Sequence, residues 1–340
     1  MHVDGLTWAI TIIVLVGILL VDFVGHVRRD HTPSMKEAGL WLGMYVGLAT
    51  IFGIFLWVSW PAPGDPHKYG LEFFSGYFTE LSLSIDNLFI FALIISSFKV
   101  PRELQQKVLA YGIALAIVFR GIFIALGAAA INAWSDIFYL FGIFMLYTAI
   151  KLVVDEVRDA PETDVDDMFV VRTLRRFVPM SSEFVGHKMV AKVDGKRMVT
   201  PMLLALVTLG AIDLLFALDS IPAIYGLTQE PYIVFTTNVF ALMGLRQMYF
   251  LLDGLLERLV YLPYGLGVIL GFIGVKLLFH ALEENNLPFI NGGKEVHVPE
   301  ISTVFSLSVI VVTLTVTVVA SAIKDRRDRE AGGISVRNRM

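Results

Sequence analysis

Two short polar motifs stand inside long apolar segments of this chain. The first is ELSLSIDN (residues 80–87) and the second is DLLFALDS (residues 213–220). Each motif begins with an acidic residue, carries a second acidic residue six positions later, and ends in a small polar residue. Oxygen ligands of this kind suit Mg²⁺, Ca²⁺ and Mn²⁺, whereas thiolates suit Cu(I) and zinc. The motifs therefore predict a hard-cation site whose candidate ligands are Glu80, Asp86, Asn87, Asp213, Asp219 and Ser220.

Helix geometry requires both motifs to contribute to one site. Residues six positions apart lie about 120° apart around a helix and about 9 Å apart along it. One helix therefore cannot bring both of its acids to the same ion, and we expect a compact site to combine acids from the two motifs. Pro222 follows the second motif and removes the hydrogen bond to the Leu218 carbonyl, which is expected to free a backbone oxygen beside Asp219.

Further polar side chains inside apolar segments are candidates for a supporting role. They are Ser84, Asn238, Arg120, Lys151, Arg246 and Lys276. The four basic residues are expected to balance the acids when no ion is bound. The alternative is that Glu80 and Asp213 are structural partners of these basic residues, and that the serines and Asn238 serve helix packing.

Other chemistries find little support. The chain has no cysteine, which excludes thiolate metal sites and disulfides, and of seven histidines only His280 falls near the interior of an apolar segment. No phosphate-binding loop or nucleophilic triad is present, so we do not expect an enzyme. The basic residues follow membrane topology and give no nucleic-acid footprint.

The elements that carry these residues are membrane-spanning helices. The chain of 340 residues is 56% hydrophobic and only 17% charged, and apolar runs of about 20 residues recur throughout. We predict an all-α polytopic membrane protein. The nine predicted spans are residues 6–25, 38–60, 71–98, 106–130, 135–154, 200–225, 230–252, 259–282 and 301–323.

The basic residues in the connections predict the orientation. Lys and Arg are concentrated in alternate connections, including residues 155–199 and the basic tail 324–340. Cytoplasmic connections carry this excess. The N-terminus is therefore predicted outside the cell and the C-terminus in the cytoplasm.

Two segments of the chain have matching charge patterns. Residues 71–154 contain the first motif, Arg120 and Lys151; residues 200–283 contain the second motif, Arg246 and Lys276. Each segment has three spans, so the second must enter the membrane from the opposite face. Such inverted repeats are typical of secondary transporters, with the substrate site near the bilayer midplane between the repeats. Residues 1–60 add two helices before the repeats, and residues 300–323 add the last helix.

The cytoplasmic loop 155–199 is the one sizeable connection. Residues 164–180 have the spacing of a short amphipathic helix for the inner leaflet, and residues 188–199 predict a hairpin around Asp194 and Gly195. The alternative is a solvated connector.

The two motif regions resemble the signature regions of the TerC family. The resemblance covers residues 6–323 and is most specific in the strings ALDSIPAI and TTNVFALMGLR. It implies a bacterial inner-membrane protein that exports a divalent metal, Mn²⁺ first among them. The family's acidic motifs fall on Glu80, Asp86 and Asn87, and on Asp213, Asp219 and Ser220.

These observations predict a secondary transporter that exports Mn²⁺ by alternating access, with Ca²⁺ and Mg²⁺ as alternative substrates. No permanently bound cofactor is expected, protons are the candidate coupling ion, and membrane lipid surrounds the chain. The alternative function is an accessory factor for membrane-protein insertion or envelope stress, in which the buried charges hold the fold. The sequence leaves the oligomeric state open.

Overall fold

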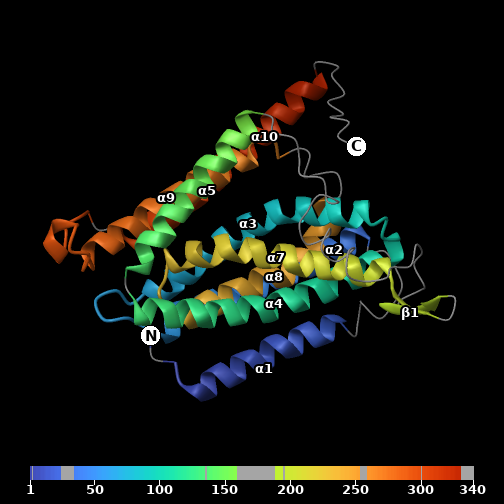
Figure 1. Cartoon of the computed structure of the whole chain (residues 1–340), viewed down its shortest axis with the longest axis horizontal. Coiled ribbons are helices and arrows are strands. Elements are labelled where there is room, and N and C mark those ends of the chain that lie inside the picture. Colours follow the sequence, from blue (N-terminus) through green and yellow to red (C-terminus); the bar gives the residue numbers. More distant parts are fainter. Residues whose placement is uncertain are drawn as a thin grey trace. The chain divides into compact units, whose positions relative to one another are not determined.

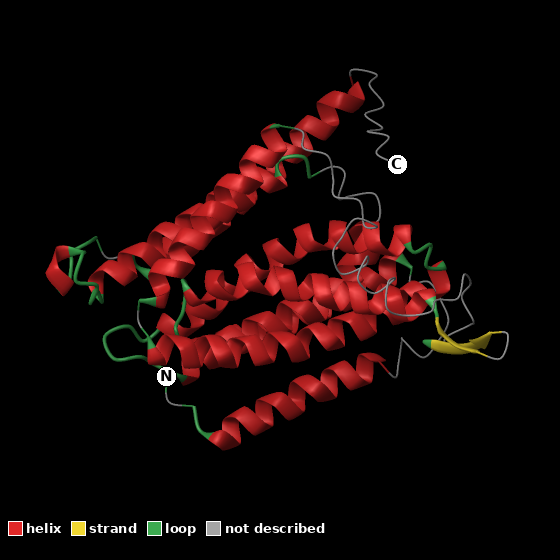
Figure 2. Ribbon diagram, in the orientation of Figure 1, coloured by secondary structure: helices red, strands yellow, loops and turns green. Residues whose placement is uncertain are grey.

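The computed structural model describes residues 1, 3–23, 34–134, 136–158, 188–193, 196–252, 259–299 and 301–330 (Figure 1). Within the helices some side chains also fall outside the description, among them those of Asp86 and Asp219. Long helices make up most of the described chain, as Figure 2 shows. The helices are α1 (Gly5–Asp22), α2 (Met35–Ser59), α3 (Lys68–Ser97), α4 (Arg102–Ala133), α5 (Ile137–Val157), α7 (Pro201–Tyr225), α8 (Pro231–Leu252), α9 (Leu262–Glu283) and α10 (Thr303–Glu330).

The protein is an all-α polytopic membrane protein, as the sequence predicts. Eight of the described helices are long and apolar enough to cross a membrane. The remaining long helix is α8, whose 22 residues include Thr236, Asn238 and Arg246. Almost all of its side chains are buried by other helices, so α8 does not need an apolar surface toward lipid.

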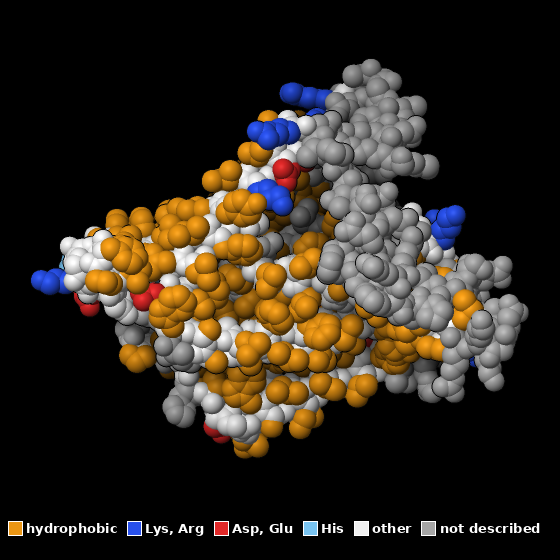
Figure 3. Space-filling model, in the orientation of Figure 1, with side chains coloured by type: hydrophobic (Ala, Val, Ile, Leu, Met, Phe, Trp, Pro, Cys, Tyr) orange, Lys and Arg blue, Asp and Glu red, His pale blue; other side chains and the backbone are white. Residues whose placement is uncertain are grey.

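Burial separates the helices that face lipid from those that form the interior. The most apolar window of α1 is 11% buried and that of α10 is 17% buried, against 67% for α3 and 56% for α7. Hydrophobic side chains accordingly cover most of the described surface visible in Figure 3. The two polar motifs lie on α3 and α7, so the chain places the acids of both motifs on well-enclosed helices.

Two helices begin at side chains suited to the first turn. The Asp4 carboxylate caps α1 by accepting a hydrogen bond from the Thr7 amide at 2.9 Å, and the Ser34 hydroxyl caps α2 by accepting one from the Glu37 amide at 3.2 Å. Both caps satisfy an amide that the helix itself leaves unpaired. Helix α7 begins at Pro201, whose missing N–H costs nothing in the first turn.

The described chain divides into two compact units. Unit 1 comprises Met1–Trp134 and Pro161–Leu251, and unit 2 comprises Ser135–Ala160 and Leu252–Met340. The first two helices of each predicted repeat therefore belong to unit 1, and the third helices, α5 and α9, belong to unit 2.

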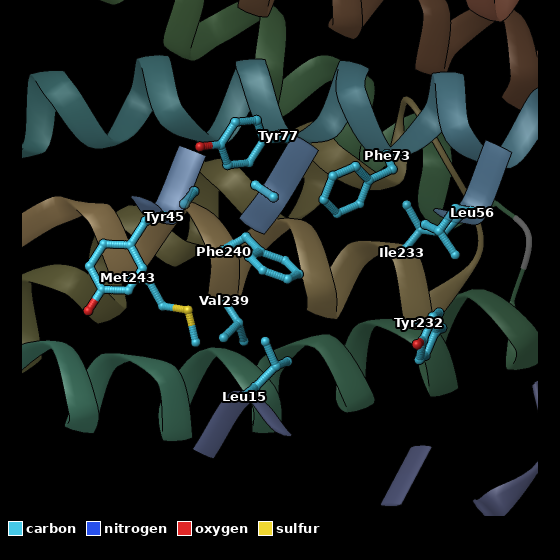
Figure 4. Packing of buried hydrophobic residues seen from close by; sticks show 12 residues of the cluster. Leu15, Tyr45, Leu56, Phe73, Tyr77, Tyr232, Ile233, Val239, Phe240 and Met243 are labelled. Atoms are coloured by element: carbon cyan, nitrogen blue, oxygen red, sulfur yellow. The ribbon is translucent and has the colours of Figure 1, made fainter. Parts of the chain in front are cut away.

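The core of unit 1 is rich in aromatic side chains. Tyr45 of α2, Phe73 and Tyr77 of α3, and Phe240 of α8 pack together, and Leu15 brings α1 against the same cluster (Figure 4). The rings of Phe73 and Tyr77 stack with centroids 6.1 Å apart, and Phe73 meets Phe240 edge to face. These contacts hold α3 and α8 in fixed register, which fixes the height of the polar residues that both helices carry.

Unit 2 is built on a close antiparallel pair, α5 and α9, seen side by side in Figure 1. A Cβ atom at Gly142 of α5 would lie 3.0 Å from the Gly274 carbonyl oxygen, and one at Gly274 would lie 3.1 Å from the Gly142 carbonyl oxygen. Small residues let helix backbones approach closely in membranes. These two glycines mark such a contact.

The contacts between α5 and α9 have an approximate two-fold symmetry. In the alignment of the two repeats, Gly142 corresponds to Gly267 and Val153 corresponds to Leu278. A Cβ at Gly142 would lie 2.7 Å from the Leu278 side chain, and a Cβ at Gly267 would lie 2.5 Å from the Val153 side chain. Each contact becomes the other when the helices are exchanged.

The connection between the repeats contains a hairpin, and the last helix extends beyond its predicted end. The predicted hairpin is confirmed: β1 (Val190–Val193) pairs antiparallel with β2 (Lys196–Val199). Its two turn residues and the amphipathic segment 164–180 lie outside the described residues. Helix α10 continues past residue 323 to Glu330, because Lys324–Glu330 contains no glycine or proline to end it.

Candidate functional site

A single buried guanidinium stands at the centre of the polar residues in unit 1. It belongs to Arg120 of α4, whose side chain is 1% exposed. Its partners come from α3, α7 and α8, so four helices contribute to one cluster. We call Glu80, Asp213, Ser220 and Asn238 the oxygen cage, because each directs an oxygen at this guanidinium.

Asp213 of α7 binds one edge of the guanidinium through both carboxylate oxygens. Arg120 Nε donates to Oδ2 at 3.0 Å and Nη2 donates to Oδ1 at 3.1 Å. Two parallel charge-assisted hydrogen bonds of this kind fix the relative orientation of both groups. The fork therefore locks the guanidinium plane to α7.

The remaining nitrogen of Arg120 faces three oxygens. Nη1 donates to Glu80 Oε1, to Asn238 Oδ1 at 2.9 Å and to Ser220 Oγ at 3.2 Å. This nitrogen carries two hydrogens. Three acceptors share them, so the oxygens around Nη1 outnumber the hydrogens that Nη1 carries.

Neighbouring contacts hold the cage in position. Asn238 Nδ2 donates to the Val234 carbonyl at 2.9 Å, which turns the amide oxygen toward Arg120. The Tyr225 hydroxyl donates to the Ile124 carbonyl at 2.8 Å and ties α7 to α4. Helix α7 runs without interruption through Pro222, and the Leu218 carbonyl there has no N–H donor at the next turn.

The charges in the cage do not cancel among its described members. Glu80 and Asp213 are both carboxylates, and Arg120 supplies the one guanidinium that pairs with them. Glu80 Oε2 is buried and has no hydrogen-bond partner within the described part of the chain, and the same holds for the nearby Ser84 hydroxyl. An unpartnered buried oxygen is costly. The cage thus carries excess negative charge and a free oxygen, the features that a cation or a proton would satisfy.

The other predicted ligands stand as follows. Asn87 is buried on α3. The side chains of Asp86 and Asp219 lie outside the described residues. Among the side chains that the structure does describe, no group of three or more His, Cys, Asp and Glu residues is arranged to hold a metal ion. In the described geometry, the place where cage oxygens converge is filled by Arg120.

Arg246, which corresponds to Arg120 in the second repeat, has a different partner. Its Nη2 donates to Asp22 Oδ1 at 2.5 Å, and its Nε donates to Gln247 Oε1 at 3.1 Å. Asp22 ends α1, outside both repeats. Neither motif points to Asp22. The signal in the sequence is one acid at the end of the first apolar run, and nothing in the sequence near it indicates its partner.

The two predicted lysines belong to unit 2. Lys276 of α9 donates to the Ser306 hydroxyl of α10 at 3.2 Å. Lys151, its counterpart on α5, is exposed. Within unit 2 the corresponding lysines therefore have unlike surroundings, because α10 covers α9 at Lys276.

The chain matches the model of one known protein family. The model of the integral membrane protein TerC family matches residues 66–329, which include every member of the cage. No solved structure matches the chain.

Several curated relatives match over most of their length. An uncharacterized membrane protein of Mycobacterium tuberculosis is 48% identical over 94% of this chain and 80% of its own. The thylakoid membrane protein TERC of Arabidopsis thaliana is 40% identical over 78% of this chain and 69% of its own. The Escherichia coli protein Alx, whose name describes a membrane-bound redox modulator, is 36% identical over 96% of this chain and 98% of its own.

Proposed function

Because the chain belongs to the TerC family of integral membrane proteins, we propose that it is a secondary transporter that exports a hard divalent cation, with Mn²⁺ as the substrate that the family resemblance favours. We place it in the bacterial inner membrane, with the N-terminus outside and the C-terminus in the cytoplasm. The observation that carries the proposal is the oxygen cage.

The cage has the chemistry of a cation site. Its members supply carboxylate, hydroxyl and amide oxygens, which are the ligands of Mn²⁺, Mg²⁺ and Ca²⁺. Intramembrane acids are costly and commonly mark ion pathways. The unpartnered oxygen of Glu80 supports a role beyond structure, because a purely structural cluster gains nothing from leaving it unpaired.

The repeats supply a means of moving the ion. Inverted repeats in transporters bind substrate between the repeats and rock about that site. The cage follows this pattern, because Glu80 comes from the first repeat and Asp213 from the second. We propose alternating access about the cage, with Asp86, Asn87 and Asp219 joining the ligands and a proton taken up by a carboxylate after release.

The names of relatives suggest other roles, which bear on this chain only indirectly. A redox function based on thiol exchange requires cysteine. This chain contains none. The alternative that the chain offers is an accessory factor in which Arg120 and its partners only hold the fold.

Metal flux into or out of proteoliposomes tests the proposal. Purified protein is reconstituted with Mn²⁺ on one side, and Ca²⁺ or Mg²⁺ is added as competitor. We expect flux from the wild type and none from Asp213→Asn, because the variant removes a carboxylate from the cage. The double variant Asp86→Asn, Asp219→Asn is expected to fail in the same way.

Glu72→Gln is the matched control. Glu72 lies on α3 two turns before Glu80, is also buried, and accepts a hydrogen bond from the Thr228 hydroxyl at 2.6 Å that a glutamine oxygen can also accept. It should keep wild-type flux. Absence of flux from the folded wild type with all three metals, under an imposed proton gradient, would favour the accessory factor.

A further inference from the structure

We propose that Arg120 is a tethered cation that competes with the transported metal for the oxygen cage and takes its place when the carrier is empty. This inference rests on the proposed function and adds a step to it. Arg120 would leave the cage as the ion enters and return as the ion leaves.

A metal ion and the Arg120 guanidinium would occupy the same space. The guanidinium lies 2.9 to 3.2 Å from oxygens of Asp213, Ser220 and Asn238 and also bonds Glu80. A divalent cation of this class would need oxygens at about 2.0–2.6 Å. A metal among the same oxygens would therefore collide with the guanidinium and be repelled by its charge. Metal and Arg120 can hold these oxygens only in turn.

Arg120 also balances the buried charges of the cage. Without Arg120, Glu80 and Asp213 would be buried without this ion-pair partner, since their side chains are at most 2% exposed. Removing one partner of a buried ion pair costs about 3–5 kcal/mol. An empty carrier must cross between its two states without metal. Arg120 lowers the charge of the cage for that return step.

An arginine side chain is suited to replacing a metal ion in the cage. Arginine stays protonated and matches a carboxylate with two parallel donors, so it can replace a metal without a proton transfer. Its long side chain can withdraw by rotamer changes while α4 stays in place. Three oxygens share the two hydrogens of Nη1. This favours replacement of the guanidinium by a cation of higher charge.

Equilibrium Mn²⁺ binding to the purified full-length protein tests this idea. Arg120→Met removes the competitor and should tighten Mn²⁺ binding by about tenfold or more, as expected for the loss of competing charge-assisted hydrogen bonds. Arg246→Met is the matched control, because Arg246 is also a buried arginine but pairs with Asp22 outside the cage. Its affinity for Mn²⁺ should stay within about twofold of the wild type.

Transport gives a readout that a structural role would not produce. Arg120→Met should still exchange Mn²⁺ for Mn²⁺ across the proteoliposome membrane, because exchange never requires an empty carrier to return. Its net Mn²⁺ efflux should be lost. A folded variant that binds Mn²⁺ more weakly than the wild type, or that carries out net efflux normally, would overturn the proposal.

Two further measurements cover the case in which Arg120→Met does not fold without metal. Added Mn²⁺ should then restore a folded protein and raise its unfolding temperature more than it raises that of the wild type. Arg120→Lys keeps the charge but loses the fork to Asp213, so it should bind Mn²⁺ more tightly than the wild type. If Mn²⁺ does not restore folded Arg120→Met, and Arg120→Lys does not bind Mn²⁺ more tightly than the wild type, the proposed competition is overturned. Absence of Mn²⁺ binding to the wild type would instead refute the proposed function.

Discussion

The choice of arginine at position 120 decides how the cage is held together. One planar group binds Asp213 along one edge and contacts three further oxygens at Nη1. A lysine ammonium has three donors on one nitrogen and cannot reproduce the fork. Arg120 therefore links four helices through one side chain, and each neutral acceptor in the cage helps to hold a buried charge.

Asn238 provides the test of this view at the residue scale. Asn238→Leu keeps the branching at Cγ but removes the oxygen that accepts from Arg120 at 2.9 Å. Hydrogen bonds to charged groups contribute about 1.5–3 kcal/mol, so the free energy of unfolding in detergent should fall by that amount.

Thr236→Val is the control for Asn238→Leu. Thr236 is buried two positions earlier on α8, and its hydroxyl donates only to helix carbonyls, at 2.8 and 3.2 Å. Thr236→Val should lower the free energy of unfolding by about 0.5–1.5 kcal/mol. Equal losses in the two variants would contradict the assignment of Asn238 to the charged cluster.

The sequence predicts the members of the site better than their pairing. Long apolar helices with polar interruptions identify Glu80, Asp213, Ser220 and Arg120, because a charge inside such a helix must have a reason. The matching charges of the two repeats leave open which of the four basic residues pairs with each acid. The structure gives both acids to Arg120 and gives Arg246 to Asp22. Pairing depends on which helices become neighbours, and the period of a helix does not contain that information.

At the scale of elements, α1 is held to unit 1 by few contacts, and the ion pair at its end is prominent among them. Asp22 and Arg246 are both buried, and the Thr11 and Tyr232 hydroxyls lie 2.7 Å apart near the other end. The rest of α1 presents mostly exposed apolar side chains. We infer that the ion pair fixes the end of α1 against α8.

A double-mutant cycle measures this pair. Asp22→Asn leaves the Arg246 guanidinium without its carboxylate and should lower the free energy of unfolding by about 3–5 kcal/mol. Arg246→Met should be destabilising for the same reason. The double variant should be closer to the wild type than the sum of the single effects, because neither charge is then stranded. Additive losses would show that the two side chains act independently.

The close approach of α5 and α9 makes a second prediction about elements. Gly142→Ala would place its Cβ 3.0 Å from the Gly274 carbonyl oxygen, a backbone atom with little freedom to move. Overpacking of this kind costs about 1–3 kcal/mol. Thermal unfolding in detergent should show the loss.

Gly271→Ala is the matched control on the same interface. Its Cβ would lie 3.8 Å from the Cβ of Ala149, which is an ordinary van der Waals contact. It should leave stability unchanged or raise it slightly, since alanine favours a helix over glycine. A loss as large as that of Gly142→Ala would argue against the close contact at Gly142.

At the scale of the whole molecule, α8 decides the topology. Eight described helices meet the length and hydropathy expected of a membrane span, and α8 differs from them because its surface is buried in protein. Four helices, α7 to α10, separate the β1–β2 hairpin from the end of the chain. If α8 crosses the membrane, the hairpin and the end of α10 lie on the same side. If α8 does not cross, they lie on opposite sides.

Single cysteines can decide between these outcomes, because the chain has none of its own. Val190→Cys in β1, Lys294→Cys after α9 and Arg326→Cys near the end of α10 all place the thiol at positions that are exposed in the structure. A membrane-impermeant maleimide should label position 294 in intact cells and should reach positions 190 and 326 only after permeabilisation. This pattern follows from the excess of Lys and Arg on the cytoplasmic side. Labelling of 190 and 326 from opposite sides would remove α8 from the set of spans. It would also end the inverted repeat as an explanation of transport, because the second repeat would then cross the membrane only twice.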